Sequence, residues 1–370
     1  MGEVFQEYSE KNHPELPALT IIQGGGTVLR EKSERKLQYD KSSLAWYKMV
    51  REDDFIVHLR SFEGGLEKSN HNGLISPAYH TFHGDEVDSR FYYPYFRSYE
   101  FIKHKLVPHV YGIRDGRSID IDGMKTIEIP WTSYEEQKKI GDYIESLDTL
   151  ITLHQRKCDE TKKLKKFMLQ KMFPKKDEKK PEIRFAGFTD DWEQRKLIDY
   201  LEVSSEKNRD NRFTKDDVLS VSGEYGIVNQ IEFQGRSFAG ASVSNYGVVE
   251  NGDVVYTKSP LKSNPYGIIK TNKGIPGIVS TLYAVYKPKE ITDSKFVQIY
   301  FELDSRMNSY MHPLVNKGAK NDMKVSAENA LKGMVSFPKK DEQEMISLYF
   351  SYLDNLIALH QRKSFFILSI

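Results

Sequence analysis

The segment Glu135–Lys157 reads EEQKKIGDYIESLDTLITLHQRK, and it returns at Asp341–Lys363 as DEQEMISLYFSYLDNLIALHQRK. Thirteen of the twenty-three aligned positions are identical, and the alignment has no gap. Self-similarity of this kind, separated by a long interval, indicates a chain built from two related halves. Each half is therefore expected to end in the same structural element.

Both copies carry apolar side chains at alternating steps of four and three residues, the spacing of a coiled-coil seam. The seam residues are Ile140, Ile144, Leu147 and Ile151 in the first copy and Ile346, Phe350, Leu353 and Ile357 in the second. One helix cannot bury such a seam alone, so we expect the two helices to pack against each other, antiparallel. The first helix should run from about Tyr134 to Met172. His154 and His360 take equivalent seam positions, which fits a structural junction better than a metal site.

Weaker similarities precede each helix in the same order. Ser9–Asn12 returns as Ser205–Asn208, and Gly73–Ser76 matches Gly277–Ser280, with spacings that drift as loop insertions would make them. Each half consists of short β-branched and aromatic runs broken by Gly, Asn, Asp and Pro, then one long helix. The sequence predicts an α+β protein of two pseudo-symmetric domains separated by two long helices packed as an antiparallel coiled coil. The predicted boundaries are 1–130 for the first domain, 131–180 for the central helix and linker, 181–338 for the second domain and 339–370 for a shortened distal helix.

Composition places the chain among folded, water-soluble proteins of more than one domain. It has 370 residues, of which 39% are hydrophobic and 29% charged. The net charge of +1 gives no global attraction to nucleic acid, so any such binding must rest on local patches. A single cysteine, Cys158, excludes an internal disulfide, and we find no secretory signal or membrane-spanning run, so a cytoplasmic protein is expected.

Motifs for catalysis are absent from the sequence. No phosphate-binding loop of the Gly-x4-Gly-Lys-Ser/Thr type occurs. Asn264–Tyr266 lacks the second proline of an amino-methyltransferase motif, and Gly24–Gly26 lacks the dinucleotide-binding register and is interpreted as a turn. No Cys or His spacing suits a metal. We therefore assign no catalytic or metal-binding residue and favour a binding protein.

Candidate nucleic-acid contacts come from basic and hydroxyl residues on glycine-containing loops. Arginine suits the two acceptors of guanine, whereas lysine and serine can contact phosphates or bases. The candidates are Arg60, Ser61, Lys68, Arg114 and Arg117 in the first half, and Lys258, Ser259, Lys262, Lys317, Lys320 and Lys324 at matching places in the second. Ordinary surface charge and neutral loop drift are alternative explanations for the same residues.

Further motifs lie between the two halves: Pro181–Phe188 reads PEIRFAGF and Asp191–Leu197 reads DWEQRKL. Together with the two Glu-Gln helices that end in His-Gln-Arg-Lys, they make the chain resemble the specificity subunits (HsdS) of type I restriction-modification systems over nearly its whole length. The resemblance implies two target-recognition domains, each reading half of a split duplex DNA site, in a non-catalytic subunit.

The same resemblance implies partners and cofactors. Two modification (methyltransferase) subunits and the restriction (translocase/endonuclease) subunits would bind this chain and carry adenine methylation and DNA cleavage. S-adenosylmethionine, ATP and magnesium would act in those partner subunits, with no cofactor in this chain.

Two features depart from the family pattern. The first half lacks the Ile-Arg-Phe…Trp-Glu-Gln-Arg-Lys-Leu lead-in, and the second helix is shorter than the first. We expect the shortening to leave roughly Lys165–Phe173 without a partner, so that this end of the helix is available for self-association. Two alternative functions remain: a coiled-coil structural adaptor that binds no DNA, and a stand-alone nuclease or methyltransferase with a cryptic site.

Overall fold

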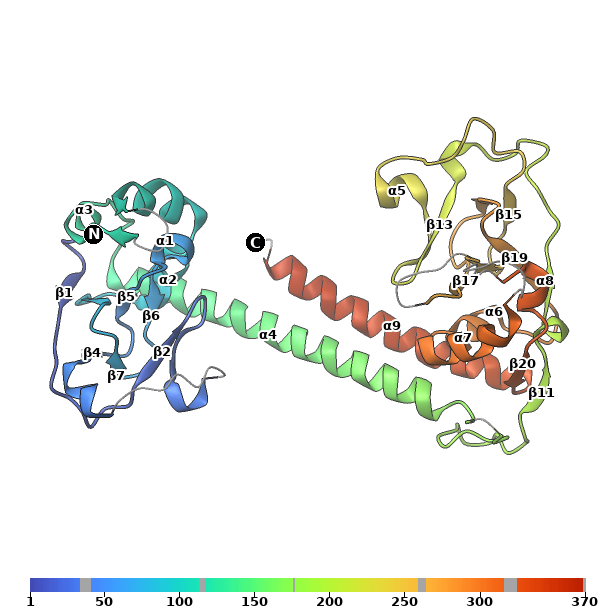
Figure 1. Ribbon diagram of the computed structural model, residues 1–370, viewed down its shortest axis with the longest axis horizontal. Helices are drawn as coiled ribbons and strands as arrows, with labels where there is room; N and C mark the ends of the chain where they lie inside the picture. Colours follow the sequence, from blue (N-terminus) through green and yellow to red (C-terminus); the bar gives the residue numbers. More distant parts are fainter. Residues whose placement is uncertain (34–40, 113–116, 176, 259–263, 316–324, 369–370) are drawn as a thin grey trace. The chain divides into compact units, whose positions relative to one another are not determined.

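A computed structural model describes the whole chain except residues 34–40, 113–116, 176, 259–263, 316–324 and 369–370 (Figure 1). The chain divides into two compact units, Met1–Leu153 and His154–Ile370. The four-part division at 130, 180 and 338 is finer than these units and stays a prediction. No helix in the described part of the chain is long and apolar enough to cross a membrane.

The first unit is built on a four-stranded antiparallel sheet. Its strand order is β1 (Gln6–Tyr8), β8 (His80–His83), β5 (Phe55–Val57) and β6 (Glu67–Lys68). Separate two-stranded ladders join β2 (Leu19–Ile22) to β3 (Gly26–Leu29), β4 (Lys48–Val50) to β7 (Gly73–Ile75) and β9 (Val110–Tyr111) to β10 (Ser118–Ile119). The short helices are α1 (Ser61–Gly64), α2 (Ser89–Phe96) and α3 (Ile121–Lys125).

Strand β5 shows how this unit buries both faces of its sheet. Successive side chains of a strand point to opposite faces. Phe55 therefore packs with Phe96 of α2 in one core, and Ile56 packs with Leu19 of β2 in another. Helices thus cover one face, and the β2–β3 and β4–β7 ladders cover the other.

The second unit repeats this plan. The strand order of its four-stranded sheet is β12 (Leu201–Val203), β19 (Ala284–Pro288), β16 (Val254–Tyr256) and β17 (Ile269–Thr271). Its two-stranded ladders join β13 (Leu219–Ser222) to β14 (Gly226–Asn229), β15 (Gly247–Val249) to β18 (Gly277–Val279) and β11 (Glu193–Lys196) to β20 (Met334–Phe337). Its short helices are α5 (Gln230–Gln234), α6 (Ser294–Tyr300), α7 (Asp304–Met311) and α8 (Ala327–Ala330). The matching strand orders confirm the predicted pair of pseudo-symmetric α+β domains.

Two long helices follow the two sheets: α4 (Tyr134–Lys171) and α9 (Lys340–Leu368). Lys165 of α4 contacts Asp354 of α9, whereas His154, eleven residues earlier, contacts His360, six residues later. The contacts run in opposite directions along the two helices, which is antiparallel packing, as predicted (Figure 1).

The expectation that Lys165–Phe173 lacks a partner is wrong. Lys165 forms ion pairs with Glu302 and Asp354 at 2.5 and 2.6 Å, and the last residues of the segment are buried. The core there includes Leu169, Met172 and Phe173 with Ile346, Phe350 and Leu353 of the predicted seam. Antiparallel packing places the end of α4 beside the beginning of α9, so a shorter end of α9 leaves this segment covered. Self-association through Lys165–Phe173 therefore loses its basis.

The remaining seam residues are only partly buried. Ile357 of α9 is half-buried, and so are Ile140, Ile144, Leu147 and Ile151 of α4. Their role in a helix pair stays a prediction.

A buried glutamine near the start of each long helix fixes that helix to its domain. Gln137 accepts a hydrogen bond from the Asp88 backbone N–H at 3.1 Å and donates to the Thr132 carbonyl at 2.8 Å. Gln343 does the same with Asp293 (3.0 Å) and Pro338 (2.9 Å). Asp88 and Asp293 are the N-cap residues of α2 and α6, so each glutamine ties the long helix to the helix that covers the sheet.

Replacing Gln343 by leucine should destabilise the second unit by about 1–3 kcal/mol, because the Asp293 N–H and the Pro338 carbonyl lose a buried partner. Urea unfolding of the full chain measures this loss. The control is Gln361→Leu at an exposed position of the same helix, which should change stability by less than about 0.5 kcal/mol. Equal midpoints for the two variants would contradict the role assigned to Gln343.

Candidate functional site

A groove of about 920 Å³ runs between the β2–β3 hairpin of the first unit and the loop that follows β5. Its cationic lining residues are Arg30, Lys32 and Arg60, and His58 and His71 also line it. None of the described residues that line the groove is acidic. A local basic surface therefore exists on a chain whose net charge is only +1.

The hairpin that forms one wall is held by a buried carboxylate. Glu67, with no exposed surface, accepts hydrogen bonds from the backbone N–H groups of Gly24 (2.7 Å) and Gly26 (3.1 Å) and from the Tyr93 hydroxyl (2.6 Å). Gly26 has a φ of 68°, and a Cβ there would lie 2.5 Å from the Lys68 carbonyl oxygen. The interpretation of Gly24–Gly26 as a turn is confirmed, and its glycines allow the turn to close over Glu67.

His58 lines the groove, and burial lowers the pKa of its ring. Its Nδ1 accepts a hydrogen bond from the Arg60 backbone N–H at 3.3 Å, so the ring hydrogen is assigned to Nε2. The Nε2 atom is buried and has no hydrogen-bond partner among the described residues.

The predicted contact residues of the first unit have different surroundings. Arg60 is exposed and lines the groove. Ser61 is buried, and its hydroxyl accepts a hydrogen bond from the His58 N–H. Lys68 forms an ion pair with Asp53 at 2.9 Å, and the exposed Arg117 stacks over the Phe62 ring. The structure brings only Arg60 into the groove, and Arg114 lies outside the described residues.

In the second unit the structure describes one predicted contact residue, Lys258. Its ammonium donates to the Thr281 carbonyl at 2.8 Å, and burial lowers its pKa. The other candidates of this unit, Ser259, Lys262, Lys317, Lys320 and Lys324, lie outside the described residues.

Sequence reasoning missed a group of exposed aromatic side chains in the second unit. Tyr225, in the turn of the β13–β14 hairpin, is 62% exposed and contacts the ring of Phe233 in α5. Just beyond α5, the Arg236 guanidinium lies 4.6 Å from the ring centre of Phe238, which is 57% exposed. Exposed aromatic rings with arginine are suited to stacking on bases and contacting the phosphate backbone. No regular spacing marks these residues in the sequence, whereas Arg30 and Lys32 could have been found from their place beside the glycine turn.

Corresponding places in the two sheets carry opposite charges. Glu67 of β6 pairs in register with Ile56, and Lys270 of β17 pairs in register with Val255 at the corresponding place. Arg97 follows the N-cap residue of α2 by the same number of residues as Glu302 follows the N-cap residue of α6, so these two positions also correspond. The first unit has Glu67 with Arg97 at 3.9 Å, and the second has Lys270 and Glu302 at the corresponding places. Burial lowers the pKa of Lys270, and the negative charge of Glu302 offsets part of that lowering. One framework therefore carries residues of opposite charge at corresponding places.

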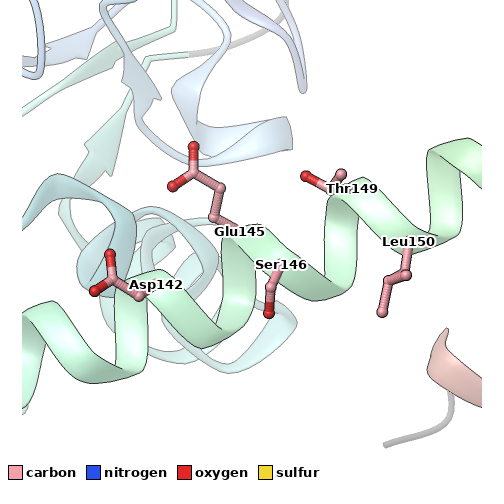
Figure 2. Close-up of a pocket in the computed structure, with 5 residues that line it drawn as sticks. All are labelled: Asp142, Glu145, Ser146, Thr149 and Leu150. Carbon is pink, nitrogen blue, oxygen red and sulfur yellow. The ribbon is translucent and has the colours of Figure 1, made fainter.

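A shallow pocket of about 520 Å³ on α4 is acidic and does not suit nucleic acid (Figure 2). It is lined by Asp142, Glu145, Ser146, Thr149 and Leu150. Asp142 and Glu145 both bind the guanidinium of Arg90, at 2.7 and 2.8 Å, which joins α4 to α2. The described residues contain no group of three or more His, Cys, Asp or Glu side chains that could hold a metal.

Comparisons with known proteins bear on the fold. No protein-family model and no curated protein matches the chain. The solved type I restriction-modification S subunit from M. genitalium matches with a TM-score of 0.52 and 13% identity, over 100% of this chain and 94% of its own. This chain has the fold of a type I S subunit.

Two further solved structures match less well. The HsdS subunit from Thermoanaerobacter tengcongensis has a TM-score of 0.48 and 14% identity, over 99% of this chain and 92% of its own. A chain from a structure of type I restriction-modification complex assembly and conformational transition has a TM-score of 0.43 and 14% identity, over 100% and 92%. The match to the M. genitalium S subunit confirms the S-subunit fold that was expected from the lead-in and helix motifs.

Replacing Glu67 by glutamine should loosen the β2–β3 hairpin. Glutamine offers one acceptor oxygen where the carboxylate offers two, and its NH₂ group would face a glycine N–H. We expect the amides of the hairpin to exchange hydrogen at least about tenfold faster, in line with a loss of about 1–3 kcal/mol. Exchange measured by mass spectrometry tests this, with exposed Glu63→Gln as the control. Unchanged exchange would show that the hairpin holds without Glu67.

Proposed function

We propose that this chain is the DNA-sequence-reading specificity subunit of a type I restriction-modification complex. Each domain reads one half of a bipartite duplex site, and the chain directs partner subunits to it. The observation that carries the proposal is one sheet framework used twice with different surfaces: a basic groove beside the β2–β3 hairpin in the first domain, and exposed aromatic side chains with Arg236 in the second. Two DNA half-sites of different sequence require two domains with different binding surfaces.

Phosphate contacts supply most of the affinity in such a reader, and base contacts supply the specificity. Arg30, Lys32 and Arg60 provide the positive charge of the first groove. In the second domain, Tyr225 and Phe238 are proposed to stack on bases or sugars.

The chemistry is proposed to belong to the partners. Two modification subunits methylate adenine with S-adenosylmethionine, and restriction subunits use ATP and magnesium to translocate and cleave DNA. This chain contributes sequence recognition and a helical framework that binds them.

The first test is sequencing-based mapping of adenine methylation after co-expression with the candidate modification subunit, with that subunit alone as the control. A split motif that is methylated only when this chain is present is the expected result. A stable complex of the two proteins without new methylation would contradict the proposal and favour a structural adaptor.

Once the motif is known, the groove can be tested by a double substitution, Lys32→Ala with Arg60→Ala. Each lost phosphate contact should lower the slope of log Kd against log salt by about 0.9. Binding of the complex to the split-site duplex, measured by fluorescence anisotropy at several salt concentrations, should weaken at least tenfold. The control is Lys138→Ala with Lys139→Ala, two exposed lysines on α4. An equal effect of both pairs would exclude the groove as the contact surface.

A further inference from the structure

The hairpins β2–β3 and β13–β14 have the same register in the two domains. Each consists of four residue pairs, and its last pair, Ile22 with Gly26 or Ser222 with Gly226, encloses a turn of three residues. The turn reads Gln-Gly-Gly in the first domain and Gly-Glu-Tyr in the second. The two hairpins therefore present the same three positions with different side chains.

Both hairpins are attached to their domains in the same way. The residue before each hairpin, Ala18 or Val218, forms a parallel bridge to strand β7 or β18. Its carbonyl accepts a hydrogen bond from the residue just after the hairpin, at 2.9 Å from the Arg30 N–H and at 2.8 Å from the Gln230 N–H. A short helix then begins, residues 30–32 in the first domain and α5 in the second. The hairpin and the helix after it thus take corresponding places, and in the first domain this place lines the basic groove.

The two turns differ in how closely the domain encloses them. In the first domain, Glu67 accepts a hydrogen bond from the Gly24 N–H at 2.7 Å, and the Asn70 side chain donates to the carbonyl of the next residue at 2.9 Å. In the second domain, a Cβ placed on Gly223 or Gly226 would meet no described atom within 4 Å, neighbouring residues aside. The turn of β13–β14 is therefore less enclosed by its domain than the turn of β2–β3.

An aromatic surface lies beside the turn of β13–β14. The rings of Tyr225 and Phe233 have their centres 5.5 Å apart. The Gln230 side chain joins this hairpin to the chain beyond α5, because it donates to the Ser220 hydroxyl at 3.0 Å and accepts from the Phe238 N–H at 2.6 Å. The turn, α5 and the exposed Phe238 thus form one connected surface.

Glu224 is an acidic residue at the centre of this turn. Its side chain is exposed, and its carboxylate has no ion pair or hydrogen bond among the described residues; only its backbone N–H is engaged, with the Ser222 hydroxyl at 3.3 Å. A carboxylate accepts hydrogen bonds and donates none, and DNA phosphates repel it. On a surface that faces DNA, such a residue is favourable only where a donor lies opposite. Glu224 therefore suits selection among bases and does not suit general affinity.

We propose, resting on the function proposed above, that the β13–β14 hairpin enters the major groove and that Glu224 selects cytosine in the half-site read by the second domain. The major groove admits a two-stranded ribbon. Cytosine presents its N4 amino donor there without an acceptor of its own, whereas adenine adds N7, and guanine and thymine present acceptors. The Glu224 carboxylate accepts from cytosine N4, and each of the other three bases places an acceptor near it. The first domain has glycine at the corresponding position, Gly24, and makes no such selection there.

The test uses the full chain co-expressed with the modification subunit, with adenine methylation mapped by sequencing. The unmodified chain should give a split motif with a cytosine in one half. Glu224→Gln should move the preference at that position to adenine, because the glutamine amide pairs with adenine N6 and N7. Glu224→Ala should remove the preference, so that methylation of sites with another base there rises at least about tenfold. The other half of the motif should not change in either variant.

Glu202→Gln, at an exposed residue of β12 in the same domain, is the matched control and should leave both halves of the motif unchanged. The Glu224 variants should keep the thermal unfolding midpoint, since the side chain is exposed and has no described partner. A split motif that Glu224→Gln and Glu224→Ala both leave unaltered would overturn this inference and leave the proposed function standing. A change in both halves, or loss of all methylation in an assembled complex, would also overturn it. Absence of any split motif with the unmodified chain would overturn the proposed function and this inference together.

Discussion

Two buried glutamines hold the architecture together. Gln137 and Gln343 have no exposed surface, and each uses its single side-chain amide to link the first turns of a long helix to the N-cap of a short helix on the sheet. A buried amide that loses a partner is costly, so the long helix can leave its domain only by breaking the hydrogen bond to the Asp88 or Asp293 N–H. The position of α4 and α9, and of the surfaces beside them, follows from this constraint.

Duplication explains why the two halves share a framework and why they differ at its surface. Sheet order, N-caps and the glutamine bridge are the same in both, because they support the core. The residues under the hairpins are free to change as long as charge is balanced locally. Glu67 near Arg97 and Lys270 near Glu302 show a reversal of charge at corresponding places.

The same comparison separates what the two halves share from what only one of them contains. Glu342 and Tyr349 are covered by Arg184 and Phe185, whereas the identical Glu136 and Tyr143 are exposed.

The sequence by itself determined the duplication, the α+β composition of each half and the extent of the long helices, since α4 was expected over Tyr134–Met172 and spans Tyr134–Lys171. These features follow from local periodicity and from repeated motifs, which a linear sequence records directly. Only the tertiary structure decided which distant groups meet: Glu67 with Gly24 across 43 residues, and Arg184 with Glu342 across 158. It also showed that Lys165–Phe173 is covered, that Ser61 is buried and that Arg30, Lys32 and His58 line one groove with Arg60. Such contacts depend on how sheets and hairpins bring separate segments together, and no spacing along the chain encodes that distance.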